Sequence, residues 1–300
     1  MIVILNRAAG GNSKPAEDSD ERIRQLLAGG ATELRIMRPD EKADLSAVAQ
    51  QAAKDPDQLI VAGGGDGTVS AVAAALAGTG KTLGVLPMGT LNHFAKDLGI
   101  PLELPAAAET ISQGHVAEVD VAEVNERVFI NNSSLGIYPK IVARREAQQE
   151  RQGRGKWHSF FWAMLHSLHR FPFLNLRLKI EGKELTRRTA FLFIGNNEYE
   201  IAGFKLGARS CLNAGKLGLY LTRSTGRFGL FRLGFHALVG RLHQAEDFET
   251  FCVEEATIEA HKPSLLVATD GEVNVMQTPL HYRIRPRALR VIVPALQESP

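Results

Sequence analysis

Val61-Ala62-Gly63-Gly64-Gly65-Asp66-Gly67-Thr68 is the stretch that decides the fold of this chain. It lies between a short apolar run at residues 58–62 and an alanine-rich helical pattern at 69–77. Glycine lets the backbone approach a ligand closely, and free N–H groups at a helix N-terminus attract anions. Asp66 would repel a bare phosphate, so it indicates either a divalent cation that arrives with a nucleotide or a hydrogen bond to a neighbouring loop. The stretch favours nucleotide phosphates with Mg²⁺ and hence phosphoryl transfer; the alternative is a tight strand-to-helix turn.

Length and composition limit the class of protein. The 300 residues predict one large domain or two medium ones, and 44% hydrophobic and 23% charged residues are ordinary for a globular protein. A formal net charge of +2 gives no support for a nucleic-acid partner. Cys211 and Cys252 are too few for a disulfide framework, which favours a reducing compartment. The N-terminal apolar run is short for a signal peptide, and no apolar run approaches about 18 residues. We expect a cytoplasmic protein whose membrane contact, if any, is peripheral at the inner face.

The first 115 residues alternate short apolar runs with helical patterns. Strands are predicted at 2–5, 33–37, 59–62 and 82–86, and helices at 19–28, 42–54, 68–77, 91–98 and 104–112. Repeated strand–helix units predict a parallel sheet with helices on both faces. Ligands of such sheets bind at the carboxyl ends of the strands, where the 63–68 loop would lie.

The pattern changes near Val116 to alternation typical of β-structure. Strands are predicted at 117–124, 127–132, 175–181, 188–195, 216–222, 250–260, 264–269 and 281–293, and helices at 140–167 and 228–243. This predicts a second, mainly antiparallel domain. We place the α/β domain at 1–122 and the β-rich domain at 123–293, and we expect the end of the chain, from 289 into the tail at 294–300, to return to the first domain.

A second chemical signal is Leu86-Pro87-Met88-Gly89-Thr90-Leu91-Asn92-His93-Phe94-Ala95. Pro87 ends a strand, Gly89 frees the backbone, and Thr90 is predicted to cap the next helix. Thr90 and Asn92 can also hydrogen-bond a nucleotide. A further glycine turn, Asn6-Arg7-Ala8-Ala9-Gly10-Gly11, follows the first strand at the same edge of the sheet.

Two familiar phosphate-binding motifs do not fit the chain. Gly78-Thr79-Gly80-Lys81-Thr82 resembles the end of a P-loop, but Ala75 stands where the first glycine belongs and the segment leads into a strand. A dinucleotide fingerprint fails because Thr68 takes the place of the third glycine.

Ala268-Thr269-Asp270-Gly271-Glu272-Val273 places two carboxylates around a glycine in a β-rich region. Asp-Gly most often forms a hairpin turn. If the segment were extended, Asp270 and Glu272 would share a strand face, and either is a candidate base at a domain cleft.

Three blocks together resemble the diacylglycerol kinase catalytic family, which includes bacterial diacylglycerol and broader lipid kinases and the sphingosine and ceramide kinases. They are GGDGTV at 64–69, LPMGTLNHFAKDLGIP at 86–101 and ATDGEVNVMQTPLHYRIRPRALRVIVP at 268–294. The resemblance implies an α/β nucleotide-binding domain similar to NAD kinases and phosphofructokinases, a C-terminal β-sandwich, and an active site in the cleft between them. It also implies ATP and Mg²⁺ as cofactors.

The resemblance assigns roles to individual residues. Asn6 and Gly10 match the first phosphate-side turn, and Thr90 matches a nucleotide contact. The phosphate loop is matched by Gly64, Gly65, Asp66, Gly67 and Thr68, with Asp66 supporting Mg²⁺. Asp120 matches an inter-domain acid linked to the site. Glu272 matches the proposed general base, with Asp270 as rival or helper.

Two departures from the family pattern matter. Met37-Arg38-Pro39-Asp40 lacks the threonine that often contacts the nucleotide after the second strand. Asn213-Ala214-Gly215-Lys216 has alanine where bacterial members carry a carboxylate ligand of a structural Mg²⁺. Because such a cation needs oxygen ligands, we predict that this structural site is lost or weakened.

The segment 140–170 carries seven basic and two acidic residues, and its second half has apolar residues at helical spacing. Such a helix can lie on an anionic bilayer, or its aromatic stripe can pack on the sandwich. We expect an ATP- and Mg²⁺-dependent lipid kinase that phosphorylates the hydroxyl of a diacylglycerol-like lipid, with no nucleic-acid partner and with a homodimer left open. The alternatives are an NAD kinase-like enzyme with a soluble substrate and a non-catalytic nucleotide or lipid sensor.

Overall fold

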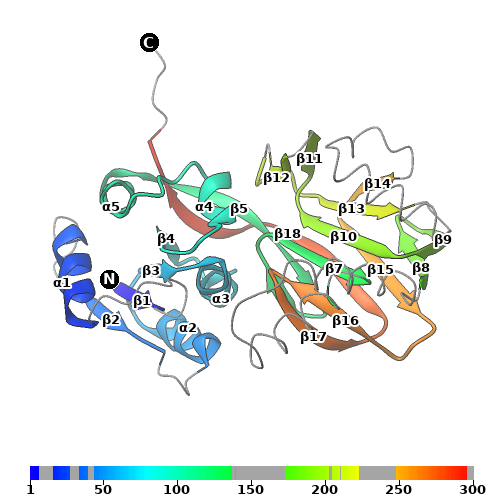
Figure 1. The fold of residues 1–300 in the computed structure, drawn as a ribbon, viewed down its shortest axis with the longest axis horizontal. Coiled ribbons are helices and arrows are strands. Elements are labelled where there is room, and N and C mark those ends of the chain that lie inside the picture. Colours follow the sequence, from blue (N-terminus) through cyan, green and yellow to red (C-terminus); the bar gives the residue numbers. More distant parts are fainter. Residues whose placement is uncertain are drawn as a thin grey trace, which may run out of the picture.

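The computed structural model describes residues 1–6, 16–27, 34–39, 44–136, 139, 173–202, 205–209, 211–222 and 248–295. Figure 1 shows two lobes connected by the long strands β5 (His115–Val124) and β18 (Leu280–Val293). The predicted helices at 140–167 and 228–243, Gly10, and the tail from 296 lie outside the described residues.

The N-terminal lobe is built on a parallel sheet, as predicted. Its strands are β1 (Ile2–Leu5), β2 (Arg35–Met37), β3 (Leu59–Gly64) and β4 (Thr82–Pro87), paired in parallel in the order β2-β1-β3-β4. Its helices are α1 (Ala16–Leu27), α2 (Leu45–Lys54), α3 (Asp66–Leu76), α4 (His93–Asp97) and α5 (Leu104–Gln113). The central strands are continuous apolar runs because they are buried on both faces. Helix α2 packs on α3, and α1 packs on α5.

The sheet of the first lobe continues into the second. Residues Arg290 and Val291 of β18 pair in parallel with Thr82 and Leu83 of β4, whereas the start of β18 pairs with β15 (Glu255–Ala260) in antiparallel fashion. Beyond β15 lie β8 (Leu174–Ile180) and β9 (Lys183–Thr189). Strand β5 lies along β18 on one side and pairs with β6 (Arg127–Phe129) on the other. The end of β18 therefore lies in the first lobe.

A second sheet covers the first to form a sandwich. It contains, in spatial order, β14 (Phe248–Val253), β13 (Leu217–Thr222), β10 (Phe191–Asn196), β7 (Asn132–Gly136), β16 (Ser264–Thr269) and β17 (Glu272–Gln277). All its pairings are antiparallel. A separate hairpin joins β11 (Tyr199–Ala202) to β12 (Lys205–Arg209). The fold is thus an α/β domain and an antiparallel β-sandwich, as the sequence predicted.

Three predicted strands are wrong because each runs across a boundary between two strands. The run 188–195 contains the end of β9 and most of β10, which belong to different sheets. The run 250–260 is two strands, β14 and β15, in different sheets. The buried positions change from odd to even numbers between Val253 and Ala256, and that change of parity marks the crossing from one sheet to the other. The run 127–132 divides into β6 and β7, and its break at Ile130 and Asn131 forms part of the site described next.

Candidate functional site

The glycine-rich loop at residues 63–68, here called the phosphate loop, joins β3 to α3. The N–H groups of Thr68 and Val69 donate to the carbonyl oxygen of Gly65 at 2.9 and 3.1 Å, which begins the helix. The N-cap residue, Gly65, has no side chain that could cap this helix N-terminus. The first N–H groups of a helix have no partner within it, so the start of α3 can hold an anion through its backbone.

Close packing explains why glycine stands in this loop. A Cβ atom on Gly64 would lie 2.4 Å from Oγ1 of Thr68, and one on Gly89 would lie 2.5 Å from Cα of Gly65. Among the described residues, a Cβ on Gly67 would meet nothing within 4 Å, so this part of the loop faces open space. The phosphate loop is therefore packed backbone against backbone on the turn after β4, while its outer face stays open to a ligand.

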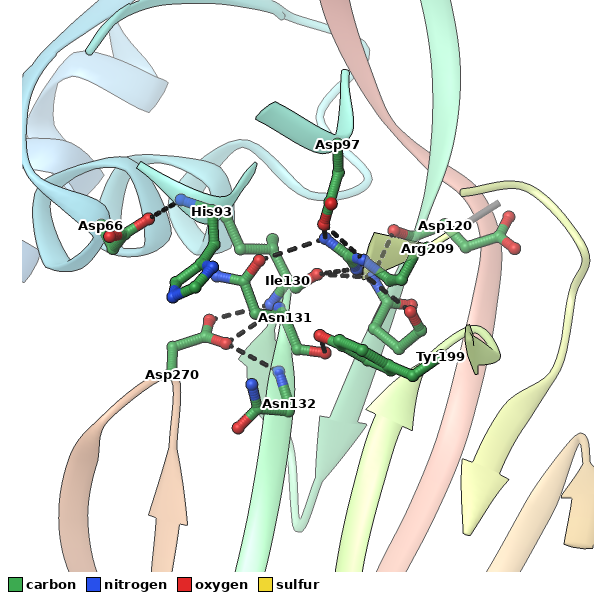
Figure 2. Close-up of polar contacts among 11 residues, drawn as sticks. Asp66, His93, Asp97, Asp120, Ile130, Asn131, Asn132, Tyr199, Arg209 and Asp270 are labelled. Carbon is green, nitrogen blue, oxygen red and sulfur yellow. Dashed lines mark hydrogen bonds and ion pairs between the residues drawn. The ribbon is translucent and has the colours of Figure 1, made fainter. Parts of the chain in front are cut away.

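Asp66 has partners that explain its place in an anion-binding loop. Its carboxylate accepts hydrogen bonds from the backbone N–H groups of Asn92 at 2.9 Å and His93 at 2.7 Å, the latter drawn in Figure 2. Of the two explanations offered for this charge, the structure shows the hydrogen bond to a neighbouring loop; the magnesium role stays a prediction. The predicted capping by Thr90 is wrong, because Asn92 occupies the N-cap of α4 and the carboxylate of Asp66 accepts from the N–H groups of Asn92 and His93.

Asn6 follows β1 at the same edge of the sheet. Its backbone N–H donates to the carbonyl oxygen of Gly63 at 3.0 Å, so Asn6 lies beside the phosphate loop. The nucleotide contacts expected of Asn6 and Thr90 stay predictions.

The acidic segment forms a two-residue hairpin turn. Asp270 and Gly271 have φ values of +48° and +88°, and Thr269 pairs with Glu272 across the turn. The hairpin interpretation is confirmed, and the extended arrangement that would place Asp270 and Glu272 on one strand face is wrong. A left-handed Asp-Gly pair turns the chain back at once, so the two carboxylates separate.

The Asp270 carboxylate is surrounded by donors. It accepts hydrogen bonds from the N–H groups of Ile130, Asn131 and Asn132 at 2.9, 2.8 and 3.1 Å, and from the hydroxyl of Ser70 on α3. Burial raises the pKa of Asp270, while these hydrogen bonds act in the opposite direction. Asp270 therefore ties the phosphate-loop helix to the sandwich and offers little room for a substrate proton.

Glu272 lies in different surroundings. Its side chain is 61% exposed and pairs with Nη2 of Arg127 at 2.6 Å. Glu272 and Gly67 line the same pocket, of about 260 Å³, together with Ser70 and Ala74 of α3 and Gln50 of α2. Of the two candidate bases, Glu272 is the accessible one.

A second contact between the lobes, made by Arg209, was not predicted from the sequence. Arg209 on β12 binds Asp97 of α4 through Nε at 2.8 Å and Nη2 at 2.7 Å, and both side chains are buried. The same guanidinium donates to the carbonyl oxygens of Ile130 and Asn196 and to Oδ1 of Asn131. Figure 2 shows residues 130–132 between Arg209 on one side and Asp270 on the other. The segment between β6 and β7 is thus held from both sides, and each holder also binds a helix of the first lobe.

Asp120 lies away from the pocket. Its buried carboxylate accepts from the backbone N–H groups of Gly215 at 2.7 Å and Arg287 at 2.8 Å, so it joins β5 to the turn before β13 and to β18. The structure does not bring Asp120 to the described residues that line the pocket with Glu272. Its catalytic role stays a prediction.

The described residues contain no cluster of side chains that could bind a metal ion by themselves. Within the described ranges, no group of three or more His, Cys, Asp or Glu side chains is arranged to bind an ion. In the turn expected to have lost a structural Mg²⁺, Ala214 N–H donates to Oδ1 of Asn197 and Lys216 pairs with Glu254. The loss of that structural site stays a prediction. A cation beside the phosphate loop would depend on oxygens of a bound nucleotide.

An α/β domain with a glycine-rich loop, joined by shared strands to a β-sandwich, agrees with the family models that match the chain. Residues 1–124 match the model of the diacylglycerol kinase catalytic domain, and residues 138–293 match the YegS C-terminal NAD kinase beta sandwich-like domain. The chain therefore belongs to the YegS-like lipid kinase family, which is related to diacylglycerol kinases.

Individual relatives span much of the chain. The "Probable lipid kinase YegS" of Salmonella gallinarum is 29% identical over 98% of this chain and 95% of its own length. "Uncharacterized protein sll0036" of Synechocystis is 28% identical over 82% of this chain, which covers 57% of that protein. A crystal structure of a diacylglycerol kinase from Bacillus anthracis matches with a TM-score of 0.70 at 23% identity, covering 97% of this chain and 96% of that one, and shows the shared fold. Within the part of the chain that the structure describes, no helix is long and apolar enough to span a membrane.

Proposed function

We propose that this protein transfers the terminal phosphoryl group of ATP, as its Mg²⁺ complex, to the hydroxyl of a lipid, with a diacylglycerol-like acceptor favoured. The observation that carries the proposal is the pocket shared by Gly67 at the open start of α3 and Glu272 from the sandwich. One side offers backbone N–H groups to phosphates, and the other offers an accessible carboxylate to a hydroxyl. The names of the relatives support a lipid as acceptor.

The residues present fit a nucleotide. The uncapped N-terminus of α3 and the open space beside Gly67 suit a phosphate chain, and Asp66 keeps the adjoining turn in place through its backbone hydrogen bonds. Mg·ATP would supply the phosphoryl group and a cation that offsets the developing negative charge.

Glu272 is assigned the role of general base, which accepts the proton of the attacking hydroxyl. Its carboxylate is exposed at the pocket, whereas that of Asp270 is occupied by four donors. Asp270 then acts as a positioning residue that fixes Ser70 of α3 relative to the turn carrying Glu272. Phosphoryl transfer depends mainly on such positioning.

The assigned base is tested by Glu272→Gln. Turnover should fall about 10²- to 10⁴-fold, while ATP still binds. Glu184→Gln is the matched control, because Glu184 is 57% exposed and pairs with Lys179 without lining the pocket, and it should retain turnover. Near-normal turnover of Glu272→Gln would exclude Glu272 as the base.

The reaction itself is tested with labelled ATP, Mg²⁺ and a panel of acceptors: diacylglycerol, monoacylglycerol, phosphatidylglycerol, sphingosine, undecaprenol and NAD. We expect a labelled lipid. Labelled NADP without labelled lipid would identify a kinase of a soluble substrate. ATP binding without any labelled product would identify a nucleotide sensor.

A further inference from the structure

The pocket beside the phosphate loop has an uneven distribution of charge. Of the described residues that line it, Arg127 alone is basic, whereas Glu126, Asp270 and Glu272 are acidic. An anionic phosphate chain that enters this pocket meets three carboxylates. The site therefore needs a positive charge, and Arg127 is the one that the lining supplies.

A rigid hairpin holds Arg127 in place. It follows the turn between β5 and β6, whose residues Asn125 and Glu126 have φ values of +45° and +68°. The Asn125 amide donates to the carbonyl oxygens of Gln277 at 3.2 Å and Pro279 at 3.3 Å, and its oxygen accepts from the N–H of His281 at 2.8 Å. The backbone that carries Arg127 is thus fixed to the connection between β17 and β18.

Only some of the N–H donors of the Arg127 guanidinium have acceptors among the described residues. Its Nε donates to Oγ1 of Thr269 at 3.0 Å, and its Nη2 donates to Glu272 at 2.6 Å. Among the described residues, Nη1 has no acceptor, and the side chain is 39% exposed. Thr269 and Glu272 therefore orient the planar group and leave N–H donors for a ligand.

A planar guanidinium with free donors suits phosphate, because its N–H groups match two phosphate oxygens at once. An exposed ion pair with Glu272 alone would contribute little to stability. We propose that Arg127 binds the terminal phosphate of the nucleoside triphosphate while its other edge keeps Glu272 beside that phosphate. This inference rests on the proposed function and adds a phosphate-binding residue to it.

Nucleotide binding provides a test that needs no turnover. Arg127→Met should weaken binding of a non-hydrolysable ATP analogue with Mg²⁺ about 10- to 100-fold, as measured by isothermal titration calorimetry. Binding of ADP should change less than about twofold, since a diphosphate lacks the group that Arg127 contacts. Arg127→Lys keeps the positive charge but loses the planar pair of N–H donors, so it should give an intermediate loss of affinity for the triphosphate alone.

Arg187→Met is the matched control. Arg187 is 35% exposed and binds Glu249 through Nε and Nη2, so it resembles Arg127 in exposure and pairing without lining the pocket. It should leave both affinities unchanged. If Arg127→Met does not fold, as judged by circular dichroism, the contrast is measured with Arg127→Lys.

Equal weakening of triphosphate and diphosphate, or no weakening of either, would overturn the inference. So would a wild-type protein that binds no nucleotide. Failure of the proposed function would give a different result. Arg127→Met would still weaken binding of the triphosphate more than that of ADP, but the wild-type protein would label no acceptor.

Discussion

The buried pair of Asp97 and Arg209 should be essential to the junction between the lobes. Asp97→Asn keeps the volume of the side chain and removes its charge. The side chain of Arg209 is 0% exposed and that of Asp97 is 8% exposed, so water cannot replace the lost carboxylate. The remaining acceptors of the guanidinium are neutral oxygens of Ile130, Asn131 and Asn196.

The expected cost follows from that geometry. Removing one partner of a buried ion pair destabilises a protein by about 3–5 kcal/mol, because the other charge stays buried without compensation. Three neutral acceptors remain, so we expect a loss near the lower limit, about 3 kcal/mol. Total stabilities are about 5–15 kcal/mol, so the variant should unfold at a clearly lower urea concentration.

Urea unfolding followed by circular dichroism measures the change, and limited proteolysis shows whether the lobes separate first. Asp97→Asn/Arg209→Met removes both charges, so it should be more stable than the sum of the single losses predicts. Lys179→Met breaks an exposed pair with Glu259 and should leave the midpoint unchanged. A loss below about 1 kcal/mol for Asp97→Asn, or additive single and double losses, would refute the coupled buried pair.

Two further substitutions test the site. Asp270→Asn places an amide group against the N–H donors of residues 130–132, so it should lower the free energy of unfolding in urea by at least about 2 kcal/mol and reduce turnover. Ser70→Ala removes only one donor to Asp270 and should have a smaller effect on both. An unfolding free energy of Asp270→Asn equal to that of the wild type would contradict the role of Asp270 as a tie between the lobes. Gly89→Ala places a methyl group 2.5 Å from Cα of Gly65 and should weaken ATP binding about tenfold or more. Gly182→Asn should not weaken it, because Gly182 has a φ of +75°, which asparagine tolerates, and a Cβ there meets no described atom within 4 Å. Unchanged ATP affinity of Gly89→Ala in calorimetry would show that the phosphate loop does not depend on this close approach.

Local pattern predicts some parts of this molecule well. The continuous apolar runs of the first lobe predict its parallel strands, and Asp270-Gly271 predicts a hairpin turn. The run 250–260 looked like one strand because both halves alternate; only the change of parity after Val253 reveals two sheets.

The side-chain contacts that join the lobes could not be predicted from the local sequence pattern. Arg209 and Asp97 are 112 positions apart, and Ser70 and Asp270 are 200 apart. Nothing in the residues around Arg209 distinguishes it from a surface arginine. Its burial depends on the arrangement of β12 against α4, which is a property of the tertiary structure.

Strand β18 has a consequence for how the chain folds. Residues 1–124 match one family model, yet within the described structure the edge of β4 next to β18, and the side of β5 along β18, are completed only by residues 280–293. A protein truncated after Val124 would leave both strands with unpaired N–H and C=O groups, an arrangement prone to aggregation. The N-terminal sheet therefore needs contacts between residues more than 200 positions apart, such as Thr82 and Arg290. Such distant pairing slows folding, so the two lobes should acquire their final structure together.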